Sequence, residues 1–150
     1  MYERALAILD QDASVWGALG YSLAYSNREI RAEEAFRRAI ELGEEQRAST
    51  ADPDPRLLSD LAGYYAMVDE TDTSRHLLDQ ANAIGTKDVR VLATIGETFE
   101  DLGEREQALV WIGKALEGGV SPDIFNSKPT LRGLVDDERY RQMVEDVRAS

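Results

Sequence analysis

One stretch of the sequence, residues 16–39, decides the fold and reads WGALGYSLAYSNREIRAEEAFRRA. Its apolar and small residues recur every three or four positions, first around Gly20 and again around Phe36. That spacing predicts two amphipathic helices, one over about 14–26 and one over 28–42. Asp12 or Ser14 can cap the first helix, Asn27 separates the two, and Gly43 is expected to end the second. The stretch therefore predicts a helix pair.

The same spacing returns twice further along the chain. Residues that match the first set in size are Leu58, Leu61, Ala62, Tyr65, Ser74, Leu78 and Ala81, and then Leu92, Ile95, Gly96, Phe99, Ala108, Ile112 and Ala115. The two later sets are 34 residues apart, whereas the first two are 42 apart, which is 34 plus eight inserted residues. The polar stretch 44–55, with two prolines, is expected to hold that insertion as an exposed loop. An internal repeat of this length is typical of stacked helical units.

These spacings divide the chain into expected segments. We assign 1–12 to the second helix of a partial repeat, 13–46 to repeat one and 47–54 to the inserted loop. Repeat two then covers 55–88, repeat three covers 89–122, and a C-terminal capping segment with a final helix covers 123–150. Asp136 or Asp137 is expected to cap that final helix. Since residues 1–12 would be an unpaired helix, we also expect the chain to be a fragment of a larger protein.

The pattern W-x2-L-G-x2-[YLF], followed by A-x3-F-x2-A with a period of 34, resembles the tetratricopeptide repeat. The first unit matches it at Trp16, Leu19, Gly20, Ala32, Phe36 and Ala39. The middle unit departs from it, with Ala62 in place of the glycine and Ser74 in place of an alanine. The resemblance covers about residues 2–122 and implies an all-α fold, a right-handed superhelical array of antiparallel helix pairs. The tail after the repeats resembles tails of bacterial kinase- and cyclase-linked proteins.

The resemblance also implies that the first helices line a concave groove, where a segment of another protein binds. Carried over by register, the groove residues are Gly17, Tyr21, Tyr25, Arg56, Ser59, Gly63, Met67, Arg90, Ala93, Glu97, Glu100 and Asp101. This groove would pass from aromatic to acidic, which predicts a partner segment with an apolar part and a basic part. An alternative is that the tyrosines pack on neighbouring helices and the acidic residues form a solvated helix face.

One subfamily holds the C-terminal carboxylate of its partner with basic and asparagine side chains. The corresponding positions here are Gly17 and Tyr21 in the first unit and Asp60 in the second. A carboxylate at Asp60 would repel such a ligand. We therefore exclude a carboxylate clamp.

Charge and composition narrow the classes of partner. The net charge is −12, from 29 acidic and 17 basic residues, and a surface of this sign repels nucleic acids and anionic membranes. There is no cysteine, so disulfides and thiolate metal sites are excluded. The longest uncharged stretch, residues 13–27, is too short for a membrane span, and residues 2–4 begin no signal peptide. We expect a cytoplasmic protein with a basic or neutral protein partner.

Residues that could support catalysis are sparse. The single histidine, His76, follows Arg75 and precedes Leu77, with no nucleophile or carboxylate that the spacing brings to it. The acidic residues Glu97, Glu100 and Asp101 do not have the spacing of a calcium loop. We therefore expect no enzymatic activity, no metal and no cofactor. The favoured function is a protein-interaction module or scaffold, and the alternative is a structural module that forms homodimers through exposed repeat faces.

Overall fold

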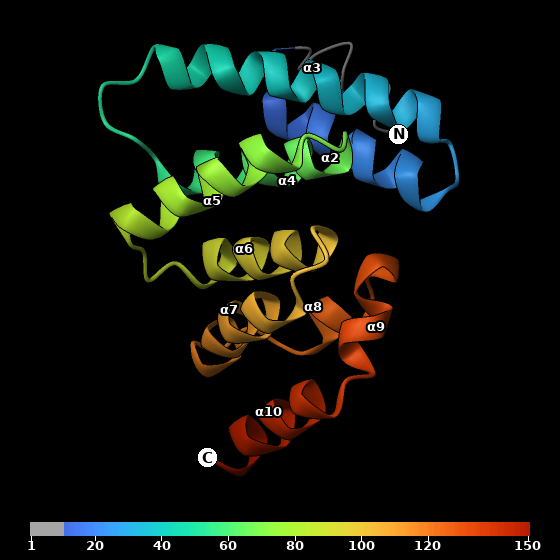
Figure 1. Cartoon of the computed structure of the whole chain (residues 1–150), viewed down its shortest axis with the longest axis vertical. Helices are drawn as coiled ribbons and strands as arrows, with labels where there is room; N and C mark the ends of the chain where they lie inside the picture. Colours follow the sequence, from blue (N-terminus) through green and yellow to red (C-terminus); the bar gives the residue numbers. More distant parts are fainter. Residues whose placement is uncertain (1–10) are drawn as a thin grey trace. The chain divides into compact units, whose positions relative to one another are not determined.

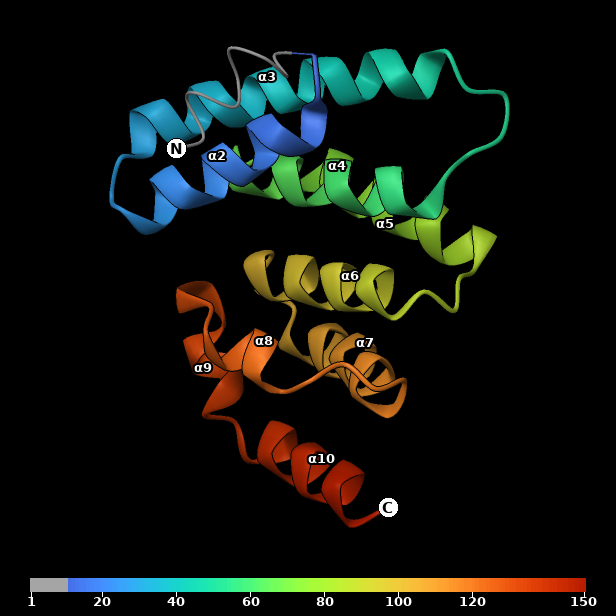
Figure 2. The same ribbon diagram turned by 180° about the vertical axis from the view of Figure 1, so that it is seen from behind.

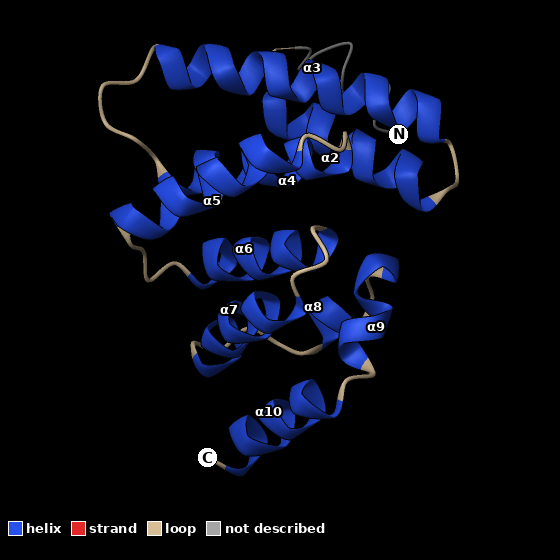
Figure 3. Cartoon of the chain, in the orientation of Figure 1, coloured by secondary structure: helices blue, strands red, loops and turns tan. Residues whose placement is uncertain are grey.

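The computed structural model describes residues 11–150, which are mostly helical and contain no strand (Figure 3). Within this range no helix combines the length and the apolar character that a bilayer crossing requires. The expected all-α class is confirmed. Ten of the twelve residues expected to form the partial repeat lie outside the described residues.

The chain divides into two compact units, and the first extends to Ile84. Its helices are α2 (Ala13–Tyr25), α3 (Glu29–Ala48), α4 (Pro55–Met67) and α5 (Thr71–Ile84). Helices α2 and α3 form one antiparallel pair and α4 and α5 form the next, while α3 also packs against α4 (Figures 1 and 2). Consecutive helices thus pack in pairs, as the repeat predicts.

The second unit begins at Gly85. It contains the antiparallel pair α6 (Val89–Asp101) and α7 (Arg105–Glu117). Three short helical segments follow, α8 (Asp123–Asn126), the 3-10 turn η1 (Pro129–Leu131) and α9 (Arg132–Val135). The final helix, α10 (Glu138–Ala149), packs against α7. The expected C-terminal helix is confirmed, with Asp137 as its cap.

The start of each pair repeats a single capping interaction. Asp12, Asp54 and Asp88 each precede a first helix, and each accepts a hydrogen bond from the backbone N–H two residues later, at 2.9, 3.0 and 3.0 Å. Such a cap satisfies one of the N–H groups that a helix start leaves without a partner. These three positions have the 42- and 34-residue spacing of the repeat.

The turn inside each pair repeats as well. Asn27, Asp69 and Gly103 adopt positive φ angles of 60°, 61° and 78°. In each case the next residue donates its backbone N–H to the carbonyl five residues earlier, at 2.9 to 3.0 Å. This is the Schellman arrangement, which requires a left-handed residue and accepts Gly, Asn or Asp there. These three turns also have the 42- and 34-residue spacing of the side-chain pattern.

Small residues let the two helices of each pair approach closely. A Cβ atom added at Gly20 would lie 2.7 Å from the Phe36 ring, and one added at Gly96 would lie 2.6 Å from Ile112 Cγ1. The middle pair has Ala62 at this position and compensates differently. There the buried Ser74 donates a hydrogen bond of 2.7 Å from Oγ to the carbonyl of Ala62. Where the middle unit departs from the sequence pattern, a hydrogen bond between its two helices thus accompanies the change of residue.

The end of α3 corrects the sequence-based prediction. The helix continues through Gly43 to Ala48, so the loop begins later than expected and spans 49–54. Gly43 is needed for close packing, because a Cβ there would lie 2.6 Å from Leu61 Cδ2. The residues that follow are good helix formers, and Arg47 Nε pairs with Glu44 Oε2 at 3.0 Å.

Candidate functional site

Four aromatic side chains from three helices of the first unit form a cluster. Tyr21 and Tyr25 come from α2, Phe36 from α3 and Tyr64 from α4. The Tyr21 ring centroid lies 4.9 Å from that of Phe36 in an edge-to-face arrangement, 6.2 Å from Tyr25 and 6.3 Å from Tyr64. Phe36 is buried, whereas the Tyr25 residue is 40% exposed. The structure thus brings together the two tyrosines predicted for the groove and anchors them on the core.

The other predicted groove residues of the first unit differ in accessibility. Gly17 is buried under the hydroxyl end of Tyr64, since an added Cβ would lie 2.4 Å from Tyr64 Oη. Ser59 is also buried, and its hydroxyl donates to the carbonyl of Arg56 at 2.9 Å. Gly63 is buried, Met67 is half-buried and Arg56 is exposed. Side-chain contact with a partner would therefore come mainly from Tyr21, Tyr25, Arg56 and Met67.

A pocket of about 190 Å³ opens at the start of α2 and α4, and we call it the polar pocket. Its lining comes from three helices and consists of Asp12, Ala13, Ser14, Gln46, Asp54, Arg56, Leu57, Asp60 and Tyr64. Gln46 lies in the part of α3 beyond Gly43, where the sequence predicted that the helix had ended. The C-terminal extension of α3 thus supplies one wall of this pocket.

The three carboxylates of the polar pocket are in different states. Asp12 and Asp54 cap α2 and α4. Asp60 is half-buried, and within residues 11–150 it forms neither a hydrogen bond nor an ion pair. Burial raises the pKa of Asp60 to about 6, while Arg56 acts to lower it and Asp54 to raise it. Of the three carboxylates, that of Asp60 is therefore the one whose oxygens can still accept hydrogen bonds.

Tyr64 completes the polar pocket. The residue is only 6% exposed, and its hydroxyl has no hydrogen-bond partner in the part of the chain that the structure describes. Burial, followed by the charges of Asp60 and Asp12, raises the pKa of Tyr64. Since Tyr64 also touches Tyr21 and Phe36, the polar pocket and the aromatic cluster share one side chain.

Two of the three acidic residues predicted for the groove in the second unit, Glu97 and Glu100, have partners. Lys128 Nζ lies 2.7 and 2.6 Å from the two carboxylate oxygens of Glu97. Arg105 donates two hydrogen bonds to Glu100, at 2.8 and 2.7 Å. Burial raises the pKa of Glu97, and Lys128 opposes that shift. Of the remaining predicted residues, Asp101 and Arg90 are exposed and Ala93 is buried. The attraction expected for a basic partner at this position is thus partly neutralised from within the unit.

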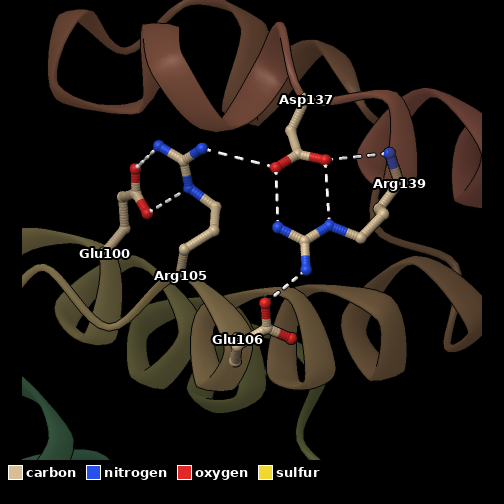
Figure 4. Close-up of polar contacts among 5 residues, drawn as sticks. All are labelled: Glu100, Arg105, Glu106, Asp137 and Arg139. Carbon is tan, nitrogen blue, oxygen red and sulfur yellow. Dashed lines mark hydrogen bonds and ion pairs between the residues drawn. The ribbon is translucent and has the colours of Figure 1, made fainter.

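An ion-pair network joins the C-terminal helix to the last helix pair (Figure 4). Arg105 lies between Glu100 and Asp137, with a distance of 3.4 Å from its Nη1 to Asp137 Oδ2. Asp137 also accepts hydrogen bonds from the backbone and side chain of Arg139, which in turn pairs with Glu106. The network thereby links α6, α7 and the start of α10.

The polar pocket was not predicted from the sequence. One signal was available, because Asp60 and Tyr64 are four residues apart and therefore share a face of α4. The contributions of Asp12 and Gln46 could not be recognised, since they depend on helices packing together and on α3 extending past Gly43.

Comparison with known proteins adds no family assignment. No protein-family model matches this chain, and no curated protein has a significantly similar sequence. The fold and the two candidate surfaces are therefore the basis on which a function can be proposed.

Proposed function

We propose that this chain is a non-catalytic interaction module of the tetratricopeptide type, which binds a segment of another polypeptide along its first helices. The aromatic cluster carries this proposal. It holds Tyr21 on the core while leaving Tyr25 40% exposed, next to a pocket rich in polar groups. A superhelical arrangement of the pairs belongs to the proposal too, supported by caps and turns that repeat in register.

The chemistry of these surfaces suits a peptide. Tyrosine offers a large contact area and loses little conformational entropy when it binds. Tyr21 is further restrained by its edge-to-face contact with Phe36. An apolar side chain of the partner would pack against the tyrosines, and the net charge of −12 favours a partner of basic or neutral character.

Peptide display followed by affinity measurement tests the proposal. Selection of random peptides on the intact chain should enrich a related set, whose dissociation constants are then measured by fluorescence anisotropy. Tyr25→Ser should weaken their binding about tenfold, because aromatic contacts often dominate an interface. Val110→Ser is the matched control, since Val110 is 51% exposed but lies on α7, the second helix of its pair.

The outcomes are distinct. Peptides that bind the wild-type chain and the Val110→Ser variant equally, and the Tyr25→Ser variant more weakly, would support the proposal. Failure to enrich any peptide, or equal binding by the Tyr25→Ser variant, would overturn it.

A further inference from the structure

The polar pocket contains acceptors that the described chain leaves unused. Asp60 has no hydrogen-bond or ion-pair partner within residues 11–150, and the 94%-buried Tyr64 has none for its hydroxyl. Both groups remain accessible from the polar pocket, since no side-chain nitrogen or oxygen of the described residues is buried without a partner, so a ligand can reach them. Their presence in one lining of about 190 Å³ points to a ligand that donates hydrogen bonds.

The charge of the polar pocket determines whether that ligand should be a cation or an anion. The starts of α2 and α4 contribute partial positive charge, but the capping carboxylates Asp12 and Asp54 offset it. Arg56 is the single cationic side chain of the lining, is exposed, and forms no ion pair with Asp60 in the described range. The charge of Asp60 therefore remains, and the polar pocket favours a cation.

We propose that the polar pocket binds a primary ammonium group, that of a lysine side chain in the partner segment, with Asp60 as its ion-pair partner. Tyr64 Oη and Asp12 provide further acceptors. This inference rests on the proposed peptide-binding function and adds a chemical requirement to it. The aromatic cluster shares Tyr64 with the polar pocket, so a lysine bound here would sit beside residues that take an apolar neighbour.

An ammonium group fits this lining better than other cations. Its three donors point in separate directions, which suits acceptors that come from different helices. A metal ion fits poorly, because no three His, Cys, Asp or Glu side chains of residues 11–150 are grouped to hold one. An anion would meet the charge of Asp60.

The test uses defined probes on the intact chain. The capped peptide Ac-Ala-Lys-Ala-NH2 is titrated into the ¹⁵N-labelled protein, and the amide shifts of α2 and α4 are followed by NMR. Butylammonium chloride reports a small amine that lacks a peptide backbone. The same peptide with an Nε-acetylated lysine keeps the backbone but removes the positive charge. We expect saturable shifts around Asp60 and Tyr64 with the lysine peptide, weaker ones with butylammonium, and none with the acetylated peptide.

Four variants assign the roles. Asp60→Asn should weaken binding of the lysine peptide about tenfold or more, as loss of a charge-assisted hydrogen bond does, and Tyr64→Phe should weaken it less. Arg56→Gln should strengthen binding, because it removes the competing positive charge. Asp79→Asn, at an exposed carboxylate of α5, is the matched control and should leave binding unchanged. If Asp60 had a purely structural role, Arg56→Gln would not increase the affinity for the lysine peptide.

The outcomes separate this inference from the proposed function. If display-selected peptides keep their affinity after lysine is replaced by norleucine, peptide binding stands and the ammonium site is overturned. If butylammonium binds as tightly as the lysine peptide, the pocket takes small amines and the lysine assignment is overturned. Equal binding of the acetylated peptide overturns the site itself.

Discussion

Asp60 illustrates, at the scale of one residue, how a fold can retain an unfavourable charge. Burial raises its pKa to about 6 from an ordinary 3.8, so ionisation is disfavoured in the folded chain. Asparagine or serine would fit the same helix without this cost. A carboxylate held under such conditions is more readily explained by a role in binding than by stability.

The first prediction concerns the pH dependence of stability at Asp60. The folded pKa lies above the unfolded one, so the stabilisation from the bound proton is complete below about pH 3.8 and is lost as the pH rises through about 6. Asp60→Asn should therefore raise the free energy of unfolding at pH 8 by about 1–3 kcal/mol and have little effect near pH 4. Urea titrations at both pH values measure this.

The control for that prediction is Asp79→Asn, which changes an exposed carboxylate of α5. It should alter the free energy of unfolding by less than about 0.5 kcal/mol at either pH. An Asp60→Asn variant that is less stable than the wild type at pH 8 would show that the Asp60 carboxylate stabilises the fold, and would contradict the expected cost of its ionisation.

Helix pairs are held, at the scale of elements, by contacts that only small residues permit. A Cβ at Gly96 would lie 2.6 Å from Ile112 Cγ1 and 3.0 Å from the Ile112 backbone nitrogen. The backbone nitrogen of Ile112 cannot move aside as a flexible side chain can. Gly96→Ala should therefore destabilise the second unit by about 1–3 kcal/mol. Helix propensity favours alanine by about 1 kcal/mol, which reduces this loss without reversing it. Thermal unfolding followed by circular dichroism provides the measurement.

Gly113→Ala is the matched control for Gly96→Ala. Its added Cβ would contact only the Sδ atom of Met143, at 3.0 Å, and methionine is a flexible side chain. We expect it to leave stability unchanged or to raise it by up to about 1 kcal/mol through helix propensity. Equal losses from the two alanines would argue against close packing at Gly96.

The ion-pair network gives a second prediction for the elements of this unit. Hydrogen bonds from Arg139 and Arg105 hold the pKa of Asp137 well below its usual range. Its contribution to stability is therefore present above the ordinary pKa of 3.8 and is lost as the pH falls through the lower folded value. Asp137→Asn should be less stable than the wild type at pH 7, and the difference should shrink as the pH falls below 4.

The variant Asp137→Ala distinguishes the contribution of the Asp137 charge to stability from the contribution of its helix cap. Asparagine can still accept the backbone N–H of Arg139, whereas alanine cannot. In urea titrations, the free energy of unfolding of the alanine variant should be lower than that of the asparagine variant at each pH. A difference between Asp137→Asn and wild type that is independent of pH would contradict the assignment of the shift to the Asp137 charge.

Most elements of the fold could be predicted because the signals that specify them are local. The helix pairs, the cap of α2 at Asp12, the cap of α10 at Asp137, and the turns at Asn27 and Gly103 follow from residues near each element. The end of α3 could not be predicted in this way. Gly43 has the usual appearance of a helix terminator, and only its contact with Leu61, 18 positions further on, shows that it serves packing.

At the scale of the whole molecule, the candidate site depends on contacts that the repeat register alone could not predict. The register placed Tyr21 and Tyr25 together, because residues four apart share a helix face. It also predicted an open acidic surface, but Lys128 from beyond the repeats pairs with Glu97. The polar pocket needs Gln46 as well, from the extension of α3. Contacts between segments 30 or more residues apart have no local signal in the sequence.

The last prediction concerns association of whole chains, the alternative to peptide binding. A net charge of −12 makes two copies repel each other, most strongly at low ionic strength, where the Debye length is about 30 Å at 0.01 M. A self-associating module must overcome that repulsion with apolar contacts, for which Ile30 (80% exposed) and Val110 (51% exposed) are available. Peptide binding needs no such contact, so we expect a 16.7 kDa monomer at both 0.01 and about 0.5 M salt.

Sedimentation equilibrium over a range of protein concentrations distinguishes the two functions. A dimer that appears as salt is raised, and is lost on Ile30→Ser or Val110→Ser, would favour the structural role. Salt should act in the opposite direction on the proposed complex, because screening weakens the attraction between Asp60 and a lysine. The two hypotheses therefore predict opposite responses of association to ionic strength, and a single salt series on the wild-type chain, with and without the lysine peptide, decides between them.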